Sequence, residues 1–183
     1  MSEDVSLSPL IAATTEWLLR AYPSGPGAFQ RSLAEAQARQ AVTVAAWLRY
    51  PTELDAELVL LTGPGGTGRL DWVTGADGSA DAGEDPGEDP GADAWRTWVD
   101  EVVASWAVSL LSDPGLAAAA MGALAGTAHA PVPPVVFRRL TEPDAHDRGA
   151  AGLLRHPDLV GPVAELHRGG LEDRLRAGTS LTG

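Results

Sequence analysis

The sequence of 183 residues predicts an α+β fold in which an antiparallel three- to four-stranded sheet is covered by α-helices. Three observations lead to this fold class. Strand-like segments follow one another with short connections, amphipathic helical segments precede and follow them, and the C-terminal part has the pattern of a helical tail. The length and the 44% apolar content suit one domain over residues 1–183.

Two helices are predicted before the strands. Ser8 followed by Pro9 is typical of a helix start, and apolar residues up to Ala21 then recur on one helical face. The run PSGPG ends this helix. A second helix is expected from about Ala28 to Gln40, where apolar residues again share one face.

Three strands are predicted next, over Ala41–Tyr50, Ala56–Thr62 and Arg69–Gly75. Their connections, PTELD and GPGGTG, are too short for a parallel crossover, which needs about a dozen residues or more. The strands are therefore expected to form an antiparallel meander. The run VVFRRL (Val135–Leu140) is a candidate fourth strand at the sheet edge.

The second half of the chain is expected to be mainly helical. Residues 76–92 are predicted to be an acidic disordered loop, because their glycine, proline and acid content cannot bury a core. Asp93 then caps the clearest helix of the chain, which continues to Leu110 with helical spacing. A small-residue helix over 116–126 follows, and the tail is expected to break at His156-Pro157, Gly161-Pro162 and Gly169-Gly170.

The stretch LVLLTGPGGTGRLDWV poses the question of a phosphate-binding loop. Gly63–Gly68 has the glycine spacing of G-x-x-x-x-G-K-[ST], but Arg69 stands at the lysine position and Leu70 at the Mg²⁺-binding hydroxyl position. The strand-like residues that follow also conflict with the helix that must begin there. We therefore favour a hairpin loop, and a degenerate nucleotide binder is the least favoured function.

Composition excludes several classes of protein. Cysteine is absent, so disulfides and thiol chemistry are excluded, and the net charge of −12 gives no basic footprint for nucleic acid. The chain has no apolar run of about 18 residues that would span a membrane, and MSEDVSLSP has no secretory pattern. Arginine replaces lysine throughout, which is typical of a high-GC bacterial genome. We expect a cytoplasmic protein without nucleic-acid or membrane partners.

Few residues suggest catalytic chemistry. His146 and Asp147, in the patch TEPDAHDRG, are the candidate acid–base residues, although acidic residues there also suit a helix start. The spacings of zinc-binding motifs such as HExxH do not occur. We therefore predict neither a metal site nor a cofactor.

Tryptophan and arginine supply the candidate binding residues. The chain has six tryptophans against two phenylalanines and two tyrosines, and tryptophan commonly anchors interfaces as well as cores. Trp72, Trp95 and Trp98 are the candidates for binding a partner. Arg138 and Arg139, on the possible edge strand, either protect that edge or contact an acidic partner.

The sequence therefore leaves two main hypotheses for function. The first is a small cytoplasmic accessory protein, expected to be a homodimer, that binds a protein or peptide through tryptophan-rich helices or a sheet edge. The alternative is a cofactor-independent enzyme of the cyclase or isomerase type, from bacterial specialised metabolism, with a tryptophan-lined pocket. A deep pocket with tryptophan would favour the enzyme, and an exposed apolar patch would favour the binding protein.

Overall fold

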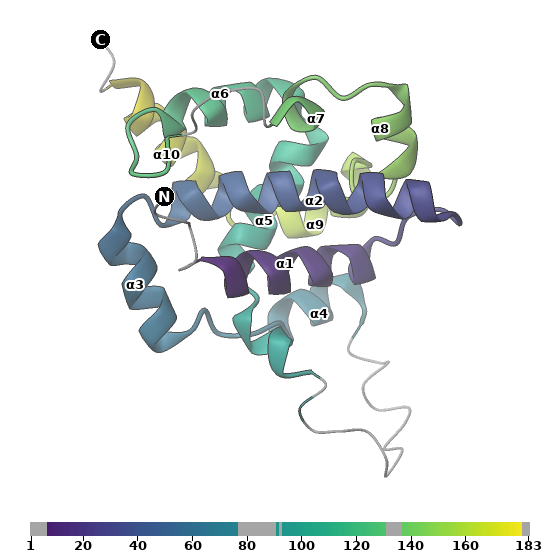
Figure 1. The fold of residues 1–183 in the computed structure, drawn as a ribbon, viewed down its shortest axis with the longest axis horizontal. Helices are drawn as coiled ribbons and strands as arrows, with labels where there is room; N and C mark the ends of the chain where they lie inside the picture. Colours follow the sequence, from purple (N-terminus) through teal and green to yellow (C-terminus); the bar gives the residue numbers. More distant parts are fainter. Residues whose placement is uncertain (1–6, 77–90, 92, 131–136, 181–183) are drawn as a thin grey trace.

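The computed structural model describes residues 7–76, 91, 93–130 and 137–180, with side chains up to residue 178. Over these residues every regular element is helical, so the predicted α+β class and its sheet are wrong (Figure 1). The elements are α1 (Ser8–Ala21), α2 (Ala28–Arg49), α3 (Glu53–Thr62), α4 (Gly68–Thr74), the 3₁₀-helix η2 (Ala94–Trp98), α5 (Glu101–Ser112), α6 (Pro114–Leu124), α7 (Arg138–Thr141), α8 (Ala145–Ala150), α9 (Pro157–Glu165) and α10 (Arg168–Ser180).

The first predicted strand, Ala41–Tyr50, is the second half of α2. Valine and threonine in this segment favour strands, but no glycine or proline separates it from the helical residues before it. Alanine has the highest helix propensity, and Ala38, Ala41 and Ala45 are fully buried at helical spacing. Packing of this alanine face outweighs the local preference for strand, so α2 continues to Arg49.

The second predicted strand, Ala56–Thr62, lies within α3. Thr52 and Asp55 form a capping box, in which the Asp55 backbone N–H donates to Thr52 Oγ1 at 3.2 Å and the Thr52 backbone N–H donates to the Asp55 carboxylate at 3.2 Å. Gly63, at a φ of 72°, ends the helix. The capping box thus provides hydrogen-bond acceptors for two N–H groups at the helix start. This arrangement is typical of a helix and not of a strand.

The third predicted strand, Arg69–Gly75, is mostly α4. Leu70 on this helix is fully buried while Trp72 is 72% exposed, so the two do not share one face of a sheet. The preceding GPGGTG stretch is a helix–helix linker rather than a hairpin loop. Its Gly65 and Gly66 N–H groups donate to the Thr97 and Val99 carbonyls, at 3.3 Å each, and fix the linker to the segment before α5.

Two further expectations differ from the structure. The candidate strand Val135–Leu140 overlaps α7, and its residues 135 and 136 lie outside the described residues. The predicted acidic loop also lies outside the described residues, except for residues 76 and 91. The predicted long helix from Asp93 is interrupted after η2. Asp100 starts α5 afresh, because its carboxylate accepts a hydrogen bond from the Val103 N–H at 3.0 Å.

Several helical predictions are confirmed. The helix starts near Ser8 and at Ala28 are found where the sequence places them, and the C-terminal tail is helical. The break before Pro157 is also present, because Pro157 begins α9. Pro162 lies inside α9, and the pair Gly169-Gly170 lies inside α10, so these two predicted breaks are wrong.

Helices α2 and α5 form the centre of the molecule and cross one another (Figure 1). α2 packs against α1, α5, α6, α7 and α8, while α5 also packs against α9. Helix α3 lies at one edge of the molecule (Figure 1), and only Ala56 and Val59 among its ten residues are buried. In the described part of the chain, no helix is both long enough and apolar enough to cross a membrane.

Candidate functional site

A cleft of about 500 Å³ lies between α3 and the first turn of α5. The end of α2 and the connection between α9 and α10 complete its walls. Its polar lining residues are Arg49, Tyr50, Asp55, Thr62, Asp100, Glu101 and His167.

Tyr50 and Asp100, which both line the cleft, are joined by a hydrogen bond. The Tyr50 hydroxyl donates to Asp100 Oδ2 at 2.5 Å, while Asp100 Oδ1 accepts the Val103 N–H that starts α5. Asp100 is only 5% exposed. Burial, and secondly the hydrogen bond to Asp100, raise the pKa of Tyr50, so its hydroxyl remains protonated at neutral pH. Both oxygens of this buried carboxylate are therefore engaged.

His167 and Glu101 form a second polar pair in the cleft. His167 Nε2 lies 2.6 Å from Glu101 Oε1, and Arg69 lies 3.3 Å from the same oxygen. A histidine beside a carboxylate is an arrangement that can accept and release protons. Glu101, which lines the cleft, is thus shared between the His167 imidazole and the Arg69 guanidinium.

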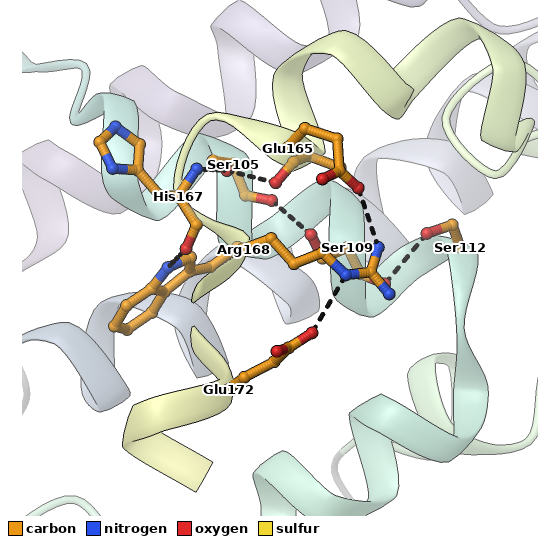
Figure 2. A network of polar contacts seen from close by, with 9 residues as sticks. Ser105, Ser109, Ser112, Glu165, His167, Arg168 and Glu172 are labelled. Atoms are coloured by element: carbon orange, nitrogen blue, oxygen red, sulfur yellow. Dashed lines mark hydrogen bonds and ion pairs between the residues drawn. The ribbon is translucent and has the colours of Figure 1, made fainter. Parts of the chain in front are cut away.

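The backbone of His167 is held against α5, as Figure 2 shows. Its N–H donates to Ser105 Oγ at 3.1 Å, and its carbonyl accepts from Trp106 Nε1 at 3.0 Å. Ser105 in turn donates to the Ala164 carbonyl at 3.0 Å. These three bonds fix the connection between α9 and α10, and so they determine where the imidazole enters the cleft.

The polar groups of the cleft are paired largely with one another. Asp55 belongs to the α3 capping box, Asp100 to Tyr50, and Glu101 to His167. Within the described residues, no group of three or more His, Cys, Asp or Glu side chains is arranged to hold a metal ion.

The outer face of α3, next to the cleft, is apolar. Leu54, Leu58 and Leu61 are 64%, 51% and 83% exposed. Successive residues of a helix are about 100° apart, so these leucines gather on the side opposite the buried Ala56 and Val59. We call the set Leu54, Leu58 and Leu61 the leucine face.

A second cavity, of about 410 Å³, lies among the ends of α1 and α4 and helix α9. Tyr22, 7% exposed, is one of its lining residues, and the Tyr22 hydroxyl is buried without a hydrogen-bond partner in the part of the chain that the structure describes. Burial raises the pKa of Tyr22 to about 12, so this hydroxyl is uncharged. The other lining residues are Ala21, Val73, Thr74, Leu153, Leu159, Pro162 and Val163.

Replacing Tyr22 by phenylalanine is expected to stabilise the protein. The change removes a buried hydroxyl that makes no hydrogen bond and keeps the ring that packs in the core. We expect the free energy of unfolding to rise by about 1 kcal/mol. Urea denaturation of Tyr22→Phe beside the wild type measures this, and a loss of stability would show that the hydroxyl has a partner in solution.

The tryptophans expected to bind a partner differ in their exposure. Trp95 and Trp98 are half-buried and pack against the core, and the Arg20 guanidinium lies 4.8 Å from the centre of the Trp95 ring. Trp72 is 72% exposed. None of the three lines either cavity.

The candidate polar residues lie together near α7 and α8. Arg139 pairs with Asp147 at 2.7 Å, and Asp147 belongs to the capping box of α8 with Asp144. Arg138 and His146 are exposed. The predicted pair of His146 and Asp147 is therefore split, since Asp147 holds helices together and His146 faces outward.

The stretch GPGGTG has one feature that a phosphate-binding loop requires, a helix that follows it. A helix does begin at Gly68, so the strand predicted there is wrong. Two observations still argue against phosphate binding: Leu70 is fully buried at the hydroxyl position, and the Gly65 and Gly66 N–H groups already bond to backbone carbonyls.

Sequence reasoning missed the cleft and the leucine face. The spacing of Leu54, Leu58 and Leu61 is helical, but the apolar run AELVLLT also resembles a buried strand. Thr52 and Asp55, three residues apart, were the available signal of a helix start. His167 and Tyr50 are far apart in the chain, and no local pattern joins them.

Comparison of this chain with protein-family models, curated proteins and solved structures finds no match. The function must therefore be argued from the chain's own residues.

Proposed function

We propose that this protein is a binding protein, and that the leucine face of α3 receives an amphipathic helical segment of a partner protein. The observation that carries the proposal is the outward position of Leu54, Leu58 and Leu61 on a helix that buries little of itself. Exposed apolar side chains gathered in one place are typical of interaction sites, and helices commonly dock through such faces.

The charges around the leucine face indicate what the partner carries. Glu53 and Glu57 flank the leucines on one side and Asp55 on the other, and α3 has no basic residue. A partner helix with lysine or arginine beside its apolar residues would pair with these carboxylates. A second copy of this chain would bring acidic residues against acidic residues, and an anionic lipid surface would be repelled likewise.

The enzyme hypothesis finds less support. The cleft contains Tyr50, Asp100 and His167, but these groups bond to other groups of the cleft, and tryptophan lines neither cavity. Binding to a partner uses a surface that is exposed without further rearrangement. We keep the cytoplasm as the proposed compartment, as the sequence leads us to expect.

The proposal is tested with a synthetic amphipathic peptide that carries leucine on one face and lysine on both flanks of that face. The wild-type protein is expected to bind it in fluorescence anisotropy, and a peptide with glutamate in place of lysine is expected to bind at least about tenfold more weakly. Raising the salt concentration should weaken binding of the lysine peptide. Equal affinity for the two peptides would contradict the proposed charge complementarity.

The combined variant Leu54→Gln, Leu58→Gln and Leu61→Gln is expected to lose binding of the lysine peptide by at least about tenfold. Each replacement should change the free energy of unfolding by no more than about 0.5 kcal/mol, because the side chains are more than half exposed. Phe29→Gln is the matched control, since Phe29 is 68% exposed but lies on α2. If the combined variant binds as the wild type does, the leucine face is not the docking surface.

The oligomeric state provides a separate check. Sedimentation of the wild type and of the combined variant is expected to give the same mass, because the acidic flanks of α3 disfavour pairing with a second copy. A dimer that the leucine replacements dissociate would mean that the second copy, rather than a basic partner helix, occupies this face.

A further inference from the structure

The second cavity is apolar except at Tyr22. Among the described residues that line it, none carries a formal charge, and the one other hydroxyl, on Thr74, donates to the Leu70 carbonyl at 3.0 Å. Its volume of about 410 Å³ lies within the usual range of pockets for small molecules. An uncharged and mainly apolar molecule fits such a lining, since a charged one would lose its hydration without gaining a partner.

The Tyr22 hydroxyl indicates that such a molecule also has a polar atom. Buried hydroxyl groups almost always have a hydrogen-bond partner, yet this one has none among the described residues, although Tyr22 is only 7% exposed. A trapped water is a poor substitute, because buried waters usually need two or more polar partners, and the one other side-chain polar atom in the described lining, Thr74 Oγ1, already donates its proton to the Leu70 carbonyl. The missing partner is therefore best supplied from outside the protein.

We propose that the cavity between α1, α4 and α9 binds a small, uncharged, largely apolar molecule with one hydrogen-bonding group, which pairs with the Tyr22 hydroxyl. The hydroxyl can serve either as donor or as acceptor. Because the Tyr22 hydroxyl is closed to solvent, binding must be accompanied by a small movement of the ring or of the half-exposed residues Leu153 and Leu159, which also line the cavity. This site is separate from the leucine face and does not depend on the function proposed for α3.

Naphthalene and 2-naphthol are suitable probes, since they have the same ring system and differ by one hydroxyl group. Isothermal titration calorimetry of the wild type is expected to show binding of 2-naphthol, with naphthalene bound about fivefold more weakly. The anion 2-naphthoate is expected not to bind. Absence of binding by 2-naphthol, or equally tight binding by 2-naphthoate, would overturn the proposal.

Two variants assign the binding to this cavity. Tyr22→Phe is expected to reduce the affinity for 2-naphthol about fivefold while leaving that for naphthalene unchanged. Leu159→Glu, at a half-exposed lining position, should weaken both probes. Leu61→Glu, an exposed position on α3, is the matched control and should change neither. Unchanged binding of 2-naphthol in Tyr22→Phe would overturn the role of the hydroxyl, and unchanged binding in Leu159→Glu would place the probe elsewhere.

Discussion

An Arg155→Ala variant is expected to lose about 3–4 kcal/mol of its free energy of unfolding. Arg155 Nε donates to Gln37 Oε1 at 2.8 Å, Nη1 to the Leu111 carbonyl at 2.6 Å, and Nη2 to the Arg139 carbonyl at 2.8 Å. Gln37 is fully buried on α2 and itself donates to the Asp147 carbonyl at 2.9 Å. Alanine would leave several buried acceptors without a donor, and α2, α5 and the α7–α8 region would lose a common connection.

Urea denaturation of the variant measures this loss, with Arg39→Ala as the control. Arg39 makes only an exposed ion pair with Glu35 at 3.4 Å, so its removal should cost no more than about 0.5 kcal/mol. Arg155→Lys is expected to fall between the two, because an ammonium group cannot direct donors at three separate acceptors as the guanidinium does. A cost below about 1 kcal/mol for Arg155→Ala would mean that water replaces its hydrogen bonds.

An Asp71→Ala variant is expected to lose about 2–4 kcal/mol. The Asp71 carboxylate accepts hydrogen bonds from Trp17 Nε1 at 2.9 Å and Thr67 Oγ1 at 2.6 Å, and it also pairs with Arg96. It thereby joins α1, α4 and η2. The Trp17 side chain is almost fully buried, so its N–H would be left without an acceptor.

Asp71 also predicts a dependence of stability on pH. Burial alone would raise its pKa, but the hydrogen bonds from Thr67, Trp17 and Arg96 together outweigh burial and lower the pKa below the ordinary value of 3.8. A carboxyl group whose pKa is lowered in the folded state contributes stability above its unfolded pKa, and this contribution is lost as the pH falls through the folded value. Melting temperatures of the wild type and Asp71→Asn should therefore differ most near neutral pH and converge below about pH 4. A difference that does not change with pH would contradict this role.

The helices with clear terminal signals could be predicted from the sequence. Pro9 and Pro157 lie in the first turns of α1 and α9, and the predicted helix start at Ala28 is also found. Proline and capping residues act through the local backbone, so their effect can be recognised without knowledge of the neighbours.

The three predicted strands failed for a different reason. The segment AVTVAAWLRY contains residues that favour strands, but it continues α2, and the packing of α2 against α1 and α5 stabilises the helix. The short connection PTELD does not indicate strand pairing either, because it contains the capping box of α3 rather than a turn between strands. Tertiary contacts therefore outweigh the strand preference in α2, whereas in α3 a local capping box marks the helix start.

The candidate sites were even less accessible from the sequence. Tyr50 and Asp100 are fifty positions apart, and Tyr22 meets its cavity partners on α9 far along the chain. The tryptophan content of the sequence predicts a binding surface of tryptophans, whereas the surface proposed from the structure consists of exposed leucines on α3. A surface of leucines on one short helix becomes recognisable only when the helix itself has been assigned.

The central place of α2 has a consequence for synthesis of the chain on the ribosome. α2 is made early, but four of the helices that pack against it, α5 to α8, begin only at Glu101 or later. Until those residues have been translated, the buried side of α2 lacks most of its neighbours. We therefore expect a chain ending after α4 to be prone to aggregation, and the nascent protein to complete its folding late in translation.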